Sequence, residues 1–154
     1  MELSWNKKVI LTGHPKKTQI EILQKSCKID DIKDLSLEEE NMIFEYDKME
    51  WKSIANFNGG EKCADMKSFL DENNRILMGK LEPGASIGIH THEGNSEIVF
   101  AVSGEAVVTM DGKKEILKAG TAHYCPMGHT HGMKNESDQP FVMFAVVPFH
   151  HVEK

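Results

Sequence analysis

Three groups that can bind a metal ion stand close together near the middle of the chain. Residues 88–97 read GIHTHEGNSE, so His90 and His92 are two positions apart and Glu97 follows five positions later. In an apolar, strand-like region, burying imidazole and carboxylate groups costs free energy unless each group finds a partner. A divalent transition metal is one such partner, because it binds ring nitrogen and carboxylate oxygen together. A loop exposed to water is the alternative.

The spacing of the two histidines predicts that they share one face of a strand. Alternate side chains of a strand point the same way, so His90 and His92 point to one face together with Ser86, and Ile87 points to the opposite face. If this strand forms a hairpin with the strand that begins at Glu97, the carboxylate lies across from the imidazoles and can reach the same ion.

A fourth ligand has to come from another part of the chain. The stretch that follows the Pro-Met-Gly turn at residues 126–128 offers His129 and His131. His131 stands at the head of a strand-like stretch, whereas His129 is nearer the turn, where we expect it to be exposed to solvent.

Short apolar or alternating runs from about residue 51 onward predict the strands that position these groups. Turn residues separate the runs, which lie at residues 75–81, 86–92, 97–103, 105–110, 114–118, 121–125 and 141–147. Asp111-Gly112 predicts a tight type I′ hairpin. Short strands with this punctuation predict an all-β sandwich or barrel.

The first part of the chain has a different pattern of residues, which predicts helical or irregular structure. Residues 20–27 place apolar side chains at helical spacing, and Ser36 with Glu39 forms a capping-box pattern. We therefore expect an N-terminal extension over residues 1–50 in front of a β domain over residues 51–154.

Composition excludes some classes of function. The chain has 154 residues and a formal net charge of −6, which argues against a general nucleic-acid binder. No apolar run is long enough to span a membrane, and the N-terminus does not read as a secretory signal. Cys27, Cys63 and Cys125 form no CxxC pair, so we expect reduced thiols that fill the core of a cytoplasmic protein.

Two motifs resemble those of the cupin superfamily, with every motif position matched. The first motif, with intervals of five, one, four and six residues, is matched by Gly84, His90, His92, Glu97 and Gly104. The second motif is matched by Gly120, Pro126, Gly128, His131 and Asn135. The resemblance implies a jelly-roll barrel, a double-stranded β-helix, with a 3-His-1-Glu metal site made of His90, His92, Glu97 and His131.

The resemblance also implies one divalent transition metal ion (Mn, Fe, Ni, Zn, Co or Cu) as cofactor, a small-molecule ligand or substrate, and a homodimer. Neither nucleic acid nor a membrane is expected as a partner. The leading hypothesis is a metal-dependent isomerase, lyase or dioxygenase that acts on a small oxygenated metabolite. The alternative is a non-catalytic binding or sensing module built on the same site. A structural, storage-like role ranks lower, because it leaves the ligand set unexplained.

For several further residues, the sequence allows more than one interpretation. His123 is the candidate catalytic acid/base, with a hydrogen-bonded barrel histidine or a subunit contact as the alternative. Tyr124 follows His123 and faces the opposite side of the strand. Arg75 either binds an anionic ligand or is a solvated strand end. His14 and the pair His150-His151 are expected to lie outside the site.

Overall fold

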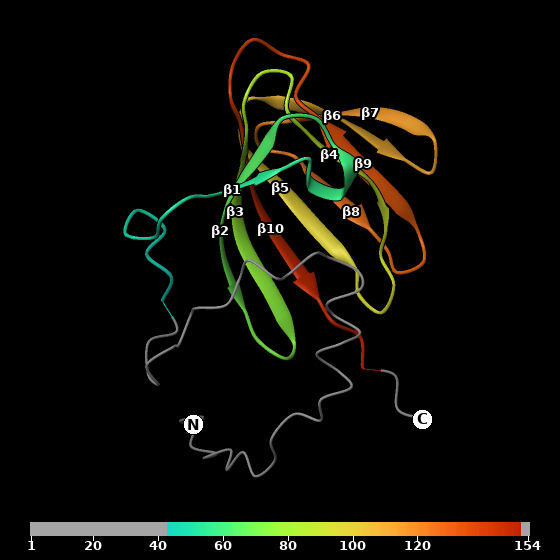
Figure 1. Ribbon diagram of the computed structural model, residues 1–154. Helices are drawn as coiled ribbons and strands as arrows, with labels where there is room; N and C mark the ends of the chain where they lie inside the picture. Colours follow the sequence, from blue (N-terminus) through green and yellow to red (C-terminus); the bar gives the residue numbers. More distant parts are fainter. Residues whose placement is uncertain (1–42, 152–154) are drawn as a thin grey trace, which may run out of the picture. The chain divides into compact units, whose positions relative to one another are not determined.

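The computed structural model describes residues 43–151, and these residues are almost entirely β-structure (Figure 1). The strands are β1 (Lys52–Ala55), β2 (Cys63–Leu70), β3 (Asn74–Leu81), β4 (Ser86–Thr91), β5 (Glu97–Ser103), β6 (Glu105–Met110), β7 (Lys113–Lys118), β8 (Ala122–Cys125), β9 (Thr130–Lys134) and β10 (Phe141–Pro148). A single 3₁₀ turn, η1 (Phe57–Gly59), interrupts them in this part of the chain. The predicted all-β jelly-roll class is confirmed. The helical patterns expected around residues 20–39 lie outside the described residues.

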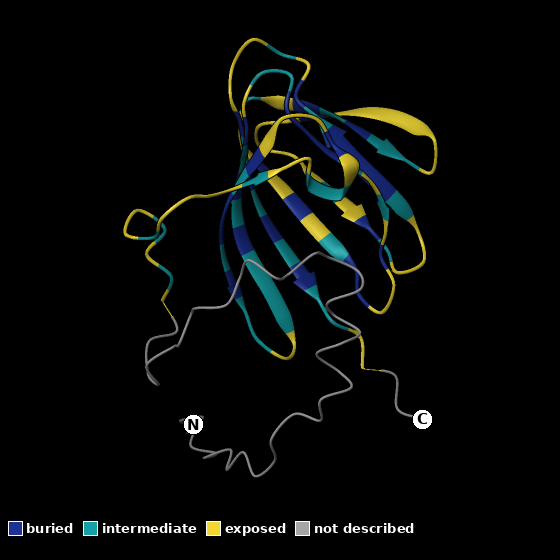
Figure 2. Cartoon of the chain, in the orientation of Figure 1, coloured by how far each residue is buried: buried dark blue, intermediate teal, exposed yellow. Residues whose placement is uncertain are grey.

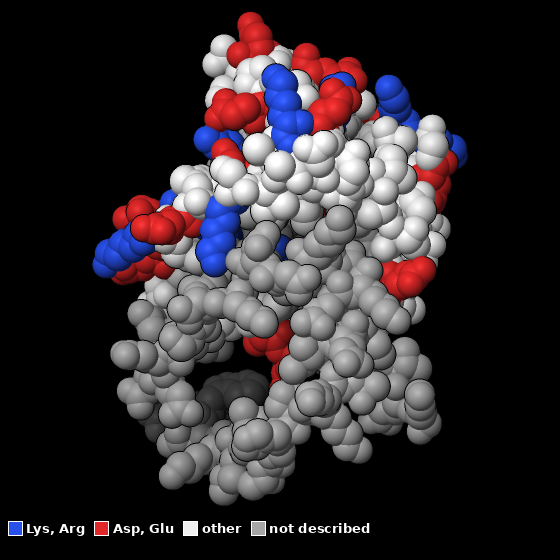
Figure 3. Space-filling model, viewed as in Figure 1, with Lys and Arg blue, Asp and Glu red and all other residues white. Residues whose placement is uncertain are grey.

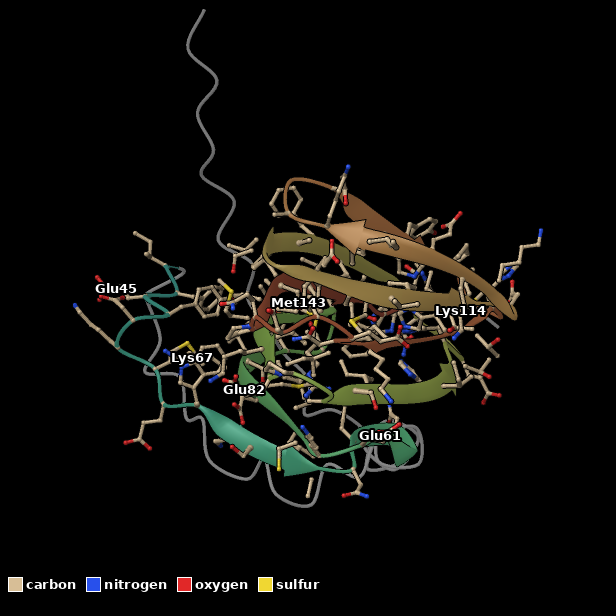
Figure 4. All side chains as sticks on the ribbon, turned by 90° about the horizontal axis from the view of Figure 1, so that it is seen from above. Glu45, Glu61, Lys67, Glu82, Lys114 and Met143 are labelled. Carbon is tan, nitrogen blue, oxygen red and sulfur yellow. The ribbon has the colours of Figure 1, made fainter. Side chains whose placement is uncertain are left out.

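The strands form two antiparallel sheets that share one core. The six-stranded sheet has the order β1-β2-β3-β10-β5-β8, and the four-stranded sheet has the order β4-β9-β6-β7. The last strand, β10, therefore lies in the middle of its sheet and pairs with both β3 and β5 (Figure 1). The core between the sheets is aliphatic, and Met143 lies within it (Figure 4). Its largest fully buried apolar side chains are Phe141, Leu81, Met143, Val99 and Val108.

The outer and inner faces of the six-stranded sheet differ in burial. Along β5, Val99 and Ala101 are buried whereas Ile98, Phe100 and Val102 are exposed, a period-2 pattern visible as alternating bands in Figure 2. This alternation is what a strand with one face on the core requires. The inner face of β5 begins at Glu97, the carboxylate singled out in the sequence.

The β6–β7 hairpin has the turn that the sequence predicts. Asp111 and Gly112 have positive φ values of 47° and 80°, and the flanking strands pair from Met110–Lys113 to Glu105–Lys118. Both central residues of a type I′ turn need positive φ, which glycine adopts freely and aspartate tolerates.

One predicted pairing is wrong. β4 and β5 do not form a hairpin, because β4 pairs with β9 in one sheet and β5 pairs with β10 and β8 in the other. The turn at residues 93–95 carries the chain from one sheet to the other. Glu97 consequently approaches the histidines across the interior of the barrel, and not along a shared ladder.

A bulge in β4 decides which side chains face the interior. Ile87 pairs with Met133 and His90 pairs with His131, so three steps along β4 match two steps along β9. Met133 and His131 share one face of β9, and therefore Ile87 and His90 face the interior together. The expectation that Ile87 points away from the histidines and that Ser86 shares their face assumed a regular strand and is wrong.

The bulge lies under a close backbone contact. A Cβ atom added to Gly88 would come within 2.2 Å of the carbonyl oxygen of Asn58, which lies in the η1 turn. Only glycine allows the two backbones to approach this closely. The η1 turn therefore packs directly on the outer side of the strand that carries His90.

The segment that precedes β1 packs on the outer face of β2 and β10. Phe44 stacks on Phe69 with ring centroids 4.6 Å apart, and Tyr46 meets Phe144 edge-on at 6.3 Å. Lys67, labelled in Figure 4 near this segment, donates a hydrogen bond to the Tyr46 carbonyl. These contacts bury Lys67 and Phe69, although both side chains point away from the barrel core.

Charged side chains of both signs are mixed on the surface shown in Figure 3. Lys80 forms ion pairs with Asp65 and Glu82, and Lys134 pairs with Glu61. Such exposed pairs each contribute little to stability. Among residues 43–151, no helix is long and apolar enough to cross a membrane.

Asn135, the last residue of the second motif, closes the barrel at the end of β9. It is fully buried, and its amide donates to the carbonyl oxygens of Leu81 and Gln139, each at 2.8 Å. Its Oδ1 accepts hydrogen bonds from the backbone and the hydroxyl of Ser137. The side chain therefore holds three chain segments together, as its structural interpretation predicts.

We expect Asn135→Ala to lower the free energy of unfolding by about 2–4 kcal/mol, because each buried polar group left without a partner costs about 1–3 kcal/mol. Urea denaturation followed by tryptophan fluorescence measures this change. Ser137→Ala is the matched control: it removes a single hydroxyl from the same cluster and should cost less than about 1 kcal/mol. Equal stability of Asn135→Ala and the parent would contradict the bracing role.

Candidate metal centre

Four side chains from three strands and one adjoining loop converge inside the barrel. His90 lies on β4, His92 follows the end of β4, Glu97 begins β5 and His131 lies on β9. One donor atom from each residue lies within 4.8 Å of those from the other three. The structure thus brings together the four residues that both motifs contribute.

The distances between donor atoms suit a shared cation. Nε2 of His131 lies 2.9 Å from Nε2 of His92 and 2.9 Å from Oε2 of Glu97. Nε2 of His92 lies 3.6 Å from Oε2 of Glu97. Two donors bound to one ion at about 2.1 Å lie no more than about 4.2 Å apart, so the separations among His92, Glu97 and His131 fit a single divalent ion. The full set with His90 spans up to 4.8 Å and would have to close slightly around an ion.

The rings of His90 and His92 are each held by a hydrogen bond at Nδ1, the nitrogen on the side away from the other donor atoms. Nδ1 of His90 lies 2.9 Å from the carbonyl oxygen of Gly88, and Nδ1 of His92 contacts Oδ1 of Asn95. Because both partners are oxygen acceptors, each ring carries a proton on Nδ1 and turns Nε2 toward the centre. Such partners orient the ligands of metal sites in proteins.

Burial and hydrogen bonding shape the ionisation of the cluster. Burial opposes ionisation of Glu97, but hydrogen bonds from His131 and His92 outweigh it and hold the carboxyl pKa well below its usual range. Burial lowers the pKa of His90, which favours its neutral, metal-binding form. Burial also opposes protonation of His92, but the hydrogen bonds with Glu97 and Asn95 outweigh it and raise that pKa.

His123, the candidate acid/base, lies directly behind the cluster. Its Nε2 is 3.0 Å from Nδ1 of His131, and the two rings stack with centroids 5.1 Å apart. Burial lowers the pKa of His123, so the ring is neutral near pH 7. His123 therefore contacts a candidate ligand on the side facing away from the converging donor atoms. Tyr124 points to the outer face, where it is exposed.

The remaining histidines lie outside the cluster. His129 is exposed and pairs with Asp111 at 2.6 Å, in agreement with its predicted exposure. His150 and His151 are also exposed, but both are hydrogen-bonded, to Ser96 and Asn73 respectively. His14 lies outside the described residues.

Arg75 is half-buried near the start of β3, on the strand face that is directed at the core. It pairs with Leu70 and Val147, it shares a face of β3 with the core residue Leu77, and its Nη2 lies 4.0 Å from Sδ of Met66. Val146 on β10 pairs with Ile98 on β5, so the β5 residue opposite Val147 is Glu97. Arg75 and Glu97 thus begin the inner faces of two strands separated by β10.

Asn95 is a functional candidate that the sequence reasoning missed. It lies in a turn, and turn residues are usually explained by backbone geometry alone. Here its side chain is buried against His92. The backbone of Phe149 bridges to Asn95, and His150 bonds to Gly94, so the chain after β10 fixes the turn. The signal in the sequence was a polar amide three residues after His92, a candidate ligand.

The two described cysteines have different surroundings. Cys63 and Cys125 are both free. Cys125 is fully buried opposite Glu97, and burial raises its thiol pKa to about 11, so it is an unreactive core residue. Cys63 is exposed at the start of β2, so its predicted core role is wrong. Cys27 lies outside the described residues.

Comparisons with known proteins place this site in context. The family model of the cupin domain matches residues 77–147. The oxalate-binding protein of Thermotoga maritima is 33% identical over 100 residues, which cover 61% of this chain and 83% of that protein.

Solved structures extend the comparison. A predicted oxalate decarboxylase from Thermotoga maritima superimposes with a TM-score of 0.67 and 29% identity over 70% of this chain and 99% of its own. An RmlC-like cupin from Shewanella frigidimarina superimposes with a TM-score of 0.61 and 17% identity over 73% and 94% of the two chains. This last likeness concerns the fold alone.

Proposed function

Because the chain belongs to the cupin superfamily, we propose that it binds one divalent transition metal through His90, His92, Glu97 and His131, and that this metal captures a small dicarboxylate such as oxalate. The observation that carries the proposal is the convergence of four side chains, each with a donor atom within 4.8 Å of those of the other three. Such a set is stable inside an apolar barrel when a cation neutralises it.

When bound, the metal would supply positive charge and a point at which an anionic ligand could be held. The chain supplies the surroundings. Val99 follows Glu97 on the inner face of β5, and Met133 follows His131 on that of β9; both are buried. These apolar walls exclude water and offer a ligand little besides the metal to bind. A small anion that chelates through two oxygen atoms fits this environment.

Arg75 supports an anionic ligand. It is the only lysine or arginine on the inner faces of β2, β3, β5 and β10, as the pairing of these strands places them. A guanidinium on the inner face of the sheet would add positive potential for an entering dianion. The name of the relative, an oxalate-binding protein, points to the same class of ligand.

Binding rather than catalysis is the function that the geometry favours. The candidate acid/base His123 directs Nε2 at His131 and not at the converging donor atoms. Among the described residues, no second acid or base faces the cluster. The second candidate function is decarboxylation of oxalate to formate and carbon dioxide. The similarity to the predicted oxalate decarboxylase favours it, and formate release from oxalate by the metal-loaded protein would establish it.

The predicted homodimer remains a proposal. Ile98, Phe100 and Val102 expose an apolar row on the outer face of β5, and Tyr124 on β8 lies opposite Ile98. Apolar rows of this kind are typical of protein–protein contacts, and pairing two such faces would cover them. We expect light scattering to give twice the chain mass, and a monomeric mass would exclude the dimer. The cytoplasmic location likewise stays a prediction.

We expect His92→Ala to lose most of its bound metal, because the change removes one of four donors and its hydrogen bond to Glu97. Elemental analysis of protein purified without a histidine tag measures the metal content per chain. His129→Ala is the matched control, since His129 is exposed and pairs with Asp111. Equal metal content in His92→Ala and the parent would end the ligand assignment.

The pH dependence of metal binding by the parent protein gives a second test of this assignment. The pKa of His92 is raised above its ordinary value, because its hydrogen bonds with Glu97 and Asn95 outweigh burial, so a metal competes with a proton for this ring more than it would for a free imidazole. Metal affinity should therefore fall as the pH is lowered through 7 toward 6. Affinity that stays constant over this range would contradict the involvement of His92.

We expect oxalate to raise the melting temperature of the metal-loaded protein by about 5–10 °C at a hundredfold excess over its dissociation constant, which corresponds to about 2.7 kcal/mol. The shift should vanish in His92→Ala and in protein treated with a chelator. Acetate, which has one carboxylate, is the ligand control and should give a much smaller shift. A metal-loaded protein that oxalate does not stabilise would refute the ligand class while leaving the metal site intact.

A further inference from the structure

We infer that His123 is a positioning residue for the metal centre: its Nε2 accepts a hydrogen bond from Nδ1 of His131 and thereby directs Nε2 of His131 at the other donors. This inference rests on the proposed metal site. It assigns His123 a role through His131, in place of direct contact with a substrate.

Each of the three histidine rings in the cluster needs a hydrogen-bond partner for its Nδ1 atom, on the side away from the centre. The three rings have different partners. His90 uses a backbone carbonyl and His92 uses an amide side chain, both of which contribute an oxygen that only accepts. His131 instead meets the imidazole of His123 at 3.0 Å. An imidazole nitrogen can either donate or accept, so the state of His123 decides the tautomer of His131.

Two proton arrangements are available to this pair. In the first, Nε2 of His123 donates to His131, whose own proton then sits on Nε2 and points at Glu97, 2.9 Å away. In the second, Nδ1 of His131 donates to His123, and Nε2 of His131 presents a lone pair to the centre. Only the second arrangement can bind a metal, and it requires His123 to be neutral with its proton on Nδ1.

Burial makes this partner hard to replace. His131 is 0% exposed with His123 in place, so a side chain of similar bulk without an acceptor at position 123 would leave the Nδ1 proton of His131 buried and unpaired, which is costly. His123 is itself half-buried on the edge strand β8, in stacking contact with His131. The stack and the hydrogen bond together fix both the tilt and the protonation of the ligand.

Two variants separate the hydrogen bond from the packing. His123→Gln keeps an oxygen acceptor near the position of Nε2, whereas His123→Leu has similar bulk and no acceptor. We expect the Leu variant to bind Zn²⁺ about 10–100-fold more weakly than the parent, and the Gln variant to stay within about threefold. Competition with a chromophoric chelator measures these affinities, and the unfolding midpoints of the metal-free proteins show whether packing has changed.

A spectroscopic measurement on the parent complements the variants, and it applies even if the Leu variant fails to fold. In the zinc-loaded protein, ¹⁵N NMR of the histidine rings should show His123 with its proton on Nδ1 and its Nε2 unprotonated. A proton on Nε2 of His123, or a Leu variant with parental zinc affinity, would overturn the positioning role. A parent that binds no Zn²⁺ would instead refute the proposed metal site itself.

Discussion

Four polar side chains have donor atoms within 4.8 Å of one another inside an otherwise apolar barrel, and the rest of the structure has to satisfy this arrangement. His92, Glu97 and His131 lie within 3.6 Å of one another through their donor atoms. Such closeness is unfavourable without a proton or a cation between the groups. The surrounding elements resist their separation, because the Nδ1 atom of each ring is hydrogen-bonded to a partner on the side away from the cluster.

The elements that hold the rings are drawn from distant parts of the sequence. The bulge in β4 lets Ile87 contribute to the core and His90 to the cluster, although a regular strand would send one of them outward. Asn95 holds His92 and is itself fixed by the chain that follows β10. His123 reaches His131 from an edge strand of the opposite sheet. The centre is therefore a property of the whole barrel and not of the two motifs alone.

The sequence was most informative where local chemistry decides the outcome. Asp111-Gly112 specifies its turn through backbone φ values, and the alternation in β5 follows from one buried face. Long-range relations were harder to predict. The spacing between His92 and Glu97 suits a hairpin as well as a crossover, and nothing local distinguishes them; the structure shows a crossover. The close contact between Gly88, at the bulge, and the η1 turn joins segments about thirty residues apart, so no local pattern predicts it. Asn95 and His123 were ambiguous because their partners are set by tertiary contacts.

The position of β10 has a consequence for how the protein is made. This strand is the last of the barrel in sequence, yet it lies between β3 and β5 in the middle of the six-stranded sheet. During synthesis, the strand that carries Glu97 lacks this neighbour until β10 has left the ribosome. The facing edges of β3 and β5 therefore stay unpaired until β10 is available, and the sheet that carries Glu97 is completed only when this strand inserts.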